Sequence, residues 1–126
     1  MPTEIVVEAE DRPGAIATVG EILGDVGVNI AAAAAFTQSG RGFIHVVVDQ
    51  ADKAAAALHE GGWTILGLRE VFTVTLDDQP GELGRFARRL SDRGINITSL
   101  YLAGASGGDK ELVVVVDDPS HARKHL

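Results

Sequence analysis

The sequence predicts an α+β protein built from two ferredoxin-like βαββαβ units, whose antiparallel sheets join edge to edge with their helices on one face. Three observations predict this fold. The chain repeats itself at an offset of 67 residues, each copy alternates β-rich and helix-periodic segments in the same order, and the second copy stops before its last strand. We therefore expect unit 1 over residues 1–68 and a C-terminally short unit 2 over residues 69–126.

The repeat is clearest where residues 8–31 are laid over residues 75–98, because 8 of these 24 positions are identical. The identical pairs are Asp11/Asp78, Pro13/Pro80, Gly14/Gly81, Leu23/Leu90, Asp25/Asp92, Gly27/Gly94, Asn29/Asn96 and Ile30/Ile97. Further on the offset becomes 68, so that residues 46–49 face residues 114–117. The extra residue falls in a Gly/Ser-rich stretch, where a loop tolerates it. The register survives the insertion, which indicates a duplication.

The first half of unit 1 reads as a strand, a helix and a strand. Residues 3–9 are β-rich, and Pro13 suits the first turn of a helix because its missing N–H has no partner there. Gly27 is a typical helix stop. The inward face of this helix is predicted from apolar residues at helical spacing, namely Ile16, Val19, Leu23 and Val26.

The second half of unit 1 completes the βαββαβ order. Strands are predicted at 28–37 and 43–49, on either side of a turn at 38–42. A helix over residues 51–60 follows and ends at two glycines. Residues 63–68 then form a fourth short strand.

Unit 2 repeats this order with one element missing. Strands are predicted at 69–77, 95–102 and 110–116, with a turn at 104–109, and a last helix opens at Asp118. The helix over residues 80–93 should turn three residues inward: Leu83, Phe86 and Leu90. No fourth strand follows, so this strand is either absent or supplied by another chain. One sheet edge is therefore left bare.

The net charge, the cysteine content and the distribution of apolar residues argue against several classes of function. A net charge of −7 argues against nucleic acid as a partner, since phosphate-binding proteins present basic patches. The chain has no cysteine, which excludes disulfides and Cys-based metal sites and suggests a cytoplasmic protein. The N-terminus has no signal-peptide pattern, and the apolar run near residues 30–36 is too short to span a bilayer. We expect no membrane association.

Catalytic and metal-binding patterns are not visible in the sequence. No Ser/His/Asp order or carboxylate pair indicates catalysis, so we expect a protein that is not an enzyme and needs no cofactor. His121 and His125 have the spacing of a metal pair, but no third ligand is evident, and we expect no metal. Four arginines of the second unit's first helix form either a solvated helix face or a docking face: Arg85, Arg88, Arg89 and Arg93.

Candidate ligand-binding residues lie at the two places where the copies are identical. The first is the turn into the first helix of each unit, comprising Asp11, Arg12, Pro13 and Gly14 in unit 1 and Asp78, Gln79, Pro80 and Gly81 in unit 2. The second is the exit from that helix, comprising Asn29 and Ile30 in unit 1 and Asn96 and Ile97 in unit 2.

These residue types suit a free amino acid. Helix N–H groups attract a carboxylate, an Asp accepts from an ammonium group, and an Asn orients a zwitterion. Each Asp has the alternative of capping its helix, and each Gly-x-Asn-Ile segment has the alternative of a tight turn.

The D-x-P-G turn, the helix and the G-[VI]-N-I exit together resemble the ACT domain, and the two copies cover nearly the whole chain. Residues 8–49 are similar to the serine-sensing regulatory domain of phosphoglycerate dehydrogenases, most clearly over residues 27–32. This resemblance implies a regulatory module that binds an amino acid between two ACT units whose second strands meet. Asp11 would then face Asn96, and Asp78 would face Asn29.

The resemblance also implies a regulator that signals to an enzyme or another regulator as partner. A homodimer is expected because the strand edges at the ends of the joined sheet are exposed. The alternative function is a ligand-free interaction module or regulatory subunit. The sequence departs from the serine-sensing pattern, which has a His four residues and an Asn two residues before the motif Pro. Ala9 and Leu76 replace the His, while Asp11 and Asp78 replace the Asn.

Overall fold

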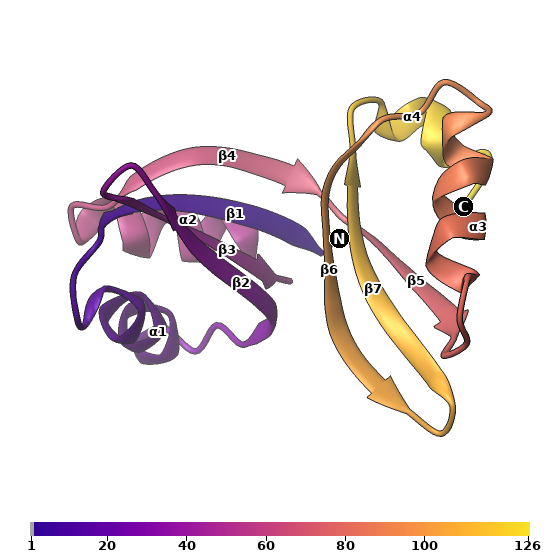
Figure 1. The fold of residues 1–126 in the computed structure, drawn as a ribbon. Helices are drawn as coiled ribbons and strands as arrows, with labels where there is room; N and C mark the ends of the chain where they lie inside the picture. The colour runs from indigo at the N-terminus through magenta and orange to yellow at the C-terminus, as the bar shows by residue number, and fades with distance from the viewer. Residues whose placement is uncertain (1) are drawn as a thin grey trace. The chain divides into compact units, whose positions relative to one another are not determined.

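The computed structural model describes residues 2–126 and divides into two compact units, the first ending at Glu70 and the second covering Val71–Leu126. Unit 1 has the order β-α-β-β-α-β that its sequence predicts (Figure 1). Its elements are β1 (Thr3–Glu10), α1 (Ala15–Asp25), β2 (Ile30–Gln38), β3 (Arg41–Val48), α2 (Ala51–Glu60) and β4 (Thr64–Glu70).

The sheet of unit 1 is antiparallel, with strand order β2-β3-β1-β4. Alternate residues of β1 and β3 point toward the helices, since successive side chains of a strand point to opposite faces. These strand residues form one core with the buried sides of α1 and α2. The core includes Ile5 and Val7 of β1, Ile44 and Val46 of β3, Val19 and Leu23 of α1, and Ala54 and Leu58 of α2. The predicted ferredoxin-like arrangement is confirmed.

Unit 2 repeats this fold without a fourth strand. Its elements are β5 (Phe72–Asp77), α3 (Glu82–Ser91), β6 (Ile97–Ser106), β7 (Asp109–Val116) and α4 (Pro119–Ala122). The sheet order is β5-β7-β6 (Figure 1). Phe86 and Leu90 of α3 belong to the core of this unit together with Ala122 of α4. Asp118 caps α4 by accepting a hydrogen bond from the His121 N–H at 3.1 Å.

The starts of the first helix in each unit differ from the prediction. Pro13 and Pro80 lie before α1 and α3 rather than within their first turns. The N-cap residues are Gly14 and Gly81, with φ of 91° and 87°. Each helix therefore begins after a left-handed residue, a conformation that glycine adopts without the steric cost of a Cβ.

Two helix residues predicted to face inward are largely exposed. Ile16 of α1 is 62 % exposed, and Leu83, which occupies the same place in α3, is 41 % exposed. Both stand in the first turn of their helix, beyond the part that the buried residues Val19 and Phe86 anchor to the sheet.

Two strand boundaries also differ from the prediction. The expected strand over residues 69–77 is two strands, because β4 continues to Glu70 and β5 begins at Phe72. The expected turn over residues 104–109 is only Gly107 and Gly108, both with positive φ. This two-residue turn lets β6 continue to Ser106, since two glycines supply the conformations that a tight hairpin needs.

Candidate functional site

The turn into α1 leaves its polar groups unsatisfied. No side chain caps α1, so Asp11 does not serve as the helix cap that its position suggested. Its carboxylate has no hydrogen-bond or ion-pair partner within residues 2–126. The N–H groups of Ile16 and Ala17 likewise have no acceptor in this part of the chain. The turn and the helix start that follows it therefore offer an unpartnered carboxylate and free helix N–H groups, which suits the two charges of an amino acid.

A cavity of about 140 Å³ adjoins this turn. Asp11 and Arg12 line its polar side, together with Glu10. The rest of the lining comes from β1, α1, β2 and β3 and is mostly apolar, with Thr37 as its one further polar side chain: Ala9, Ala15, Ile16, Ala35, Phe36, Thr37, Gly42, Phe43 and Ile44. An apolar cavity of about 150 Å³ is large enough to admit benzene, so this one has room for the side chain of an amino acid.

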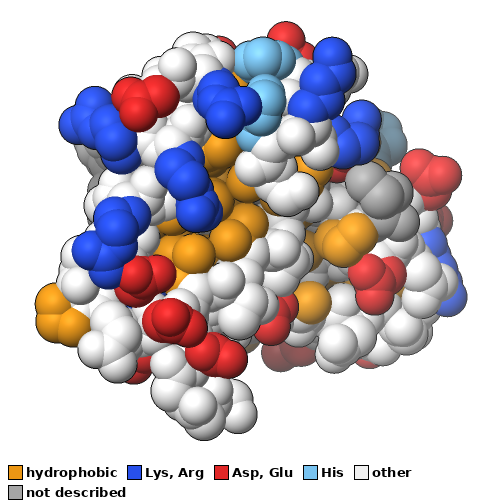
Figure 2. Space-filling view, turned by 90° about the vertical axis from the view of Figure 1, so that its right-hand side faces the viewer, with side chains coloured by type: hydrophobic (Ala, Val, Ile, Leu, Met, Phe, Trp, Pro, Cys, Tyr) orange, Lys and Arg blue, Asp and Glu red, His pale blue; other side chains and the backbone are white. Residues whose placement is uncertain are grey.

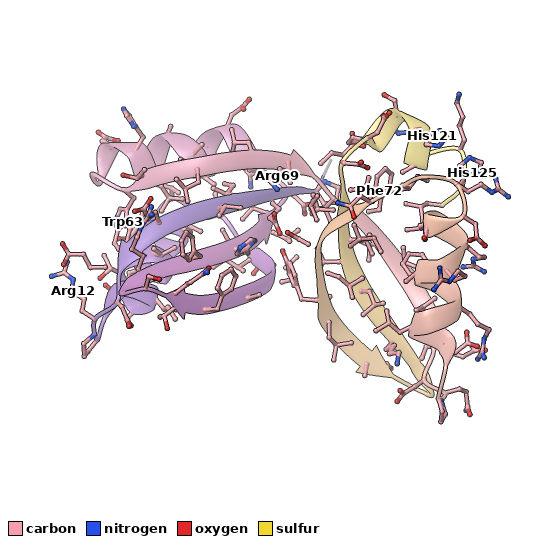
Figure 3. All side chains as sticks on the ribbon, turned by 45° about the horizontal axis from the view of Figure 1, so that its top comes forward. Arg12, Trp63, Arg69, Phe72, His121 and His125 are labelled. Atoms are coloured by element: carbon pink, nitrogen blue, oxygen red, sulfur yellow. The ribbon has the colours of Figure 1, made fainter. Side chains whose placement is uncertain are left out.

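Arg12 lines both this cavity and a second hollow, which Trp63 also lines. Figure 3 shows Arg12 and Trp63 at the same end of the unit 1 sheet. The Arg12 guanidinium lies 3.5 Å from the Glu10 carboxylate and the Arg12 side chain is exposed. This exposed pair allows Arg12 to swing toward an anionic group, because a surface ion pair of this kind holds its side chains only weakly.

The equivalent turn of unit 2 is filled by long charged side chains. Lys110 approaches Asp78 to 3.6 Å, and Arg85 donates a hydrogen bond to the carbonyl of Pro80 at 3.4 Å. A Cβ added at Gly81 would meet Arg85 at 2.9 Å, whereas a Cβ added at Gly14 would meet nothing within 4 Å. The repeat places small residues, Gly42 and Thr18, where unit 2 has Lys110 and Arg85. The two turns are thus chemically different.

The glycine of the shared Gly-x-Asn-Ile segment is explained by the way α1 and α3 end. Gly27 has φ of 75°, and the N–H groups of Gly27 and Val28 donate to the carbonyls of Gly24 and Leu23. This is the Schellman pattern of helix termination, with Val28 buried as its apolar contact. Gly94 and Ile95 repeat it in unit 2.

The asparagines are not explained by this helix ending. Asn29 and Asn96 are exposed, and neither side-chain amide has a hydrogen-bond partner within residues 2–126. Asn96 is held only through its backbone, which exchanges hydrogen bonds with Asp117. The next residues, Ile30 and Ile97, pack against the cores of their units.

One unit does not bring its own Asp and Asn together. Glu10, just before Asp11, pairs with Arg41 at one end of the sheet, while Ile30, just after Asn29, pairs with Val48 at the other end. The two ends are separated by the length of α1, about 16 Å for a helix of this length. Each unit therefore holds only half of the predicted ligand-binding set.

The aromatic part of the cavity was not anticipated from the sequence. Phe36 and Phe43 lie on paired positions of β2 and β3 with ring centroids 5.5 Å apart, and the Arg41 guanidinium stands over Phe43 at 5.5 Å. The available signal was the hairpin itself, because residues on either side of a turn at 39–40 must face each other.

The two C-terminal histidines interact with Arg93 of the chain. His121 Nε2 lies 2.9 Å from the Arg93 carbonyl, and His125 Nδ1 lies 2.5 Å from the Arg93 guanidinium. Partial desolvation, followed by the charges of Arg93, His121 and Lys124, lowers the pKa of His125. Within residues 2–126, no three His, Asp or Glu side chains are grouped closely enough to hold a metal ion.

The length and hydrophobicity of the helices bear on whether any of them could span a membrane. Within the described residues, none has the combined length and hydrophobicity that crossing a bilayer requires.

Comparison with solved structures shows the same fold over nearly the whole chain. Protein BT0572 from Bacteroides thetaiotaomicron is 20 % identical, with a TM-score of 0.82 over 98 % of this chain and 87 % of that one. The regulatory subunit of aspartate kinase from Thermus flavus is 18 % identical, with a TM-score of 0.76 over 98 % and 86 % of the two chains. The corresponding subunit from Thermus thermophilus is 18 % identical, with a TM-score of 0.71 over 90 % and 82 %.

Comparison with sequences assigns the family. Among curated proteins, none matches the chain. The ACT domain model, in contrast, matches twice, over residues 3–58 and 71–126, and these ranges fall within the two structural units. ACT domains are regulatory ligand-binding modules. The chain therefore belongs to the ACT domain family and carries two ACT domains in tandem.

Proposed function

We propose that this protein is a non-catalytic regulator of the cytoplasm that binds a free amino acid with an apolar side chain and signals to a protein partner. The observation that carries the proposal is the turn before α1, where an unpartnered carboxylate, free helix N–H groups and an apolar cavity adjoin one another. The regulatory subunits of aspartate kinase share the fold and support a regulatory role.

The chemistry of the turn assigns a role to each group. The Asp11 carboxylate accepts from the α-ammonium, and the N–H groups of Ile16 and Ala17 donate to the α-carboxylate. The side chain enters the cavity between Ala15, Phe36 and Phe43. Because most of this lining is apolar, an aliphatic or aromatic side chain gains more from burial there than the hydroxymethyl group of serine does. Ala9 in place of the His of the serine-sensing pattern agrees with this choice.

The second half of the site comes from another ACT unit. A unit places its Asp and Asn at opposite ends of its sheet, so Asp11 requires an asparagine from elsewhere. We assign this role to Asn96, in an arrangement where the sheets join through β2 and β6 and where two chains form a homodimer. Asn29 and Asp78 form the pseudo-symmetric second site, which Lys110 and Arg85 make less accessible.

A thermal-shift screen against the twenty amino acids tests the proposal. Aliphatic or aromatic amino acids should raise the melting temperature at millimolar concentration, because a ligand at 100 times its Kd stabilises the native state by about 2.7 kcal/mol. The shift should disappear in Asp11→Asn and in the double variant Asn29→Ala, Asn96→Ala. Asp78→Asn is the matched control and should retain most of it.

Covering the turn from the α1 side, where Thr18 lines the second hollow, gives a second test. Thr18→Arg introduces in unit 1 the arginine that covers the turn of unit 2, and it should abolish the shift while leaving the exposed surface of α1 folded. If no amino acid produces a shift, or if the shift persists in Asp11→Asn, the proposed site is wrong.

The second candidate function is an interaction module that binds no small ligand. The exposure of Ile16 and Leu83 at equivalent places of α1 and α3 favours it, because exposed apolar residues in both copies suit a protein contact. It predicts a negative amino-acid screen together with a protein partner whose binding is lost in Ile16→Asp.

A further inference from the structure

A groove in unit 2 lies outside the site described above. Its floor is formed by Phe72 and Val74 of β5 with Phe86 of α3. Its rim carries Arg89, Arg123 and His125. Figure 2 shows basic and histidine side chains around exposed hydrophobic surface on this side of the molecule, and Figure 3 shows Phe72 with His121 and His125 in the same unit.

The two units differ in how their first strands, β1 and β5, are paired. In unit 1, β1 pairs with β3 on one side and with β4 on the other. β4 runs antiparallel to β1, from Thr64 opposite Glu8 to Glu70 opposite Thr3. In unit 2, β5 occupies the place of β1 and pairs with β7, but no strand of residues 2–126 pairs with its other edge. An extended segment running antiparallel to β5 would complete the repeat.

The second helix of unit 2 leaves this edge open as well. α2 has ten residues and covers the core of unit 1 with Ala54 and Leu58. α4 has four residues and contributes only Ala122. The floor residues Phe72 and Val74 consequently remain partly exposed, and a segment added to β5 would cover them.

The charges around the groove indicate which segment would fit it. Residues 1–70 contain 4 basic and 10 acidic residues, a net charge of −6, whereas residues 71–126 contain 7 and 8, a net charge of −1. Two of these basic residues, Arg89 and Arg123, line the groove, together with His125 and with no acidic side chain. Arg89 stands over the Phe86 ring at 5.8 Å and Arg123 over the Phe72 ring at 5.9 Å, so both guanidinium groups flank the apolar floor. Acidic side chains complement this rim.

We propose that the free edge of β5 binds an extended acidic segment of a partner protein, which adds to the sheet as its fourth strand. Backbone hydrogen bonds to β5 provide part of the affinity. Aliphatic side chains on the helix-facing side of the segment cover Phe72 and Val74, and acidic side chains on that same side pair with Arg89 and Arg123. The site is separate from the Asp11 turn and does not depend on the function proposed for it.

A designed peptide tests this proposal on the intact chain. The probe is a fluorescein-labelled, end-blocked nonapeptide, Glu-Thr-Ile-Thr-Val-Thr-Ile-Thr-Glu, in which every second side chain faces the helices once it forms a strand. Fluorescence anisotropy should show saturable binding that weakens as NaCl is raised from about 50 to 500 mM, because salt screens exposed charges. The same peptide with lysine at both ends should bind at least about tenfold more weakly. Proline in place of the central valine should also abolish binding, since proline cannot donate to a strand partner.

Charge reversal on α3 provides matched variants. Arg89→Glu should weaken binding of the acidic probe at least about tenfold, whereas Arg88→Glu, the neighbouring exposed arginine outside the groove, should change it less than about threefold. Arg89→Glu should in turn bind the lysine-ended peptide better than the unaltered chain does, which separates charge complementarity from misfolding.

Four results would overturn the proposal: no saturable binding, equal binding of the proline peptide, equal effects of the two arginine variants, or absence of the charge-swap rescue. Loss of a dimer in Arg89→Glu without any peptide binding would instead assign the edge to a second copy of this chain.

Discussion

Replacing Gly14 and Gly20 by alanine should change the stability of unit 1 in opposite directions. Both glycines belong to the same helical region, and an added Cβ meets no atom within 4 Å at either one. Gly14, however, has φ of 91° before α1, whereas Gly20 lies inside the helix. The two variants therefore separate backbone conformation from packing.

The magnitudes follow from these conformations. A left-handed conformation costs an L-residue about 1–2 kcal/mol, so Gly14→Ala should lower the free energy of unfolding by about that amount. Alanine is better than glycine inside a helix by about 0.8–1 kcal/mol, so Gly20→Ala should raise it. The two variants should consequently differ by about 2–3 kcal/mol.

Urea unfolding followed by Trp63 fluorescence measures this difference. Trp63 is the only tryptophan of the chain and packs against the core of unit 1, so its emission reports on that unit. With a typical slope of about 1–3 kcal/mol per molar urea, Gly14→Ala should lower the midpoint by several tenths of a molar or more. Equal midpoints for the two variants, or a lower midpoint for Gly20→Ala, would refute the conformational argument.

Three further changes have expected outcomes of their own. Leu58→Ala should cost about 2–5 kcal/mol, because the side chain is fully buried; a urea midpoint within error of the parent protein would contradict this. Asp118→Ala should cost about 0.5–2 kcal/mol through loss of the bond to the His121 N–H, seen as faster amide exchange in α4, and unchanged exchange would show that the cap is dispensable. An NMR titration should place the pKa of His125 below its ordinary value, and Arg93→Gln should raise it because removal of a nearby cation favours protonation. A downward shift in that variant would rule out the charge effect.

Local patterns predicted the elements of this fold well. Gly27 was predicted to end a helix, and its Schellman bonds confirm this, while Gly94 forms the same bonds at the equivalent place of unit 2. The strands over residues 3–9 and 43–49 were predicted as elements, but their core residues were not named, although a strand buries every second residue on one face, as Ile5 and Val7 of β1 show. The predictions for Pro13 and Ile16 were wrong, since each assumed a helix that begins at the proline, and a left-handed Gly14 delays it to Ala15.

The candidate site could be predicted only in part. The Asp11 turn was located from the repeat, but its cavity depends on Gly42, which lies on another strand and reaches the turn through the pairing of β1 with β3. The difference between the two turns arises in the same way. Lys110 approaches Asp78 across the sheet. Contacts between residues this far apart in the chain follow from strand register, which the order of elements alone does not specify.

Lys110 and Arg85 occupy the turn of unit 2, which leaves the turn of unit 1 as the accessible one. The number of accessible turns determines how steeply ligand binding rises with ligand concentration. A chain with two equivalent, coupled sites responds steeply over a narrow range of ligand concentration. A chain with a single accessible turn saturates at one equivalent and responds gradually over a wide range. Under the proposed function, such a protein would report the level of its amino acid in proportion, and the second ACT unit would contribute the asparagine and the partner contact rather than a second ligand site.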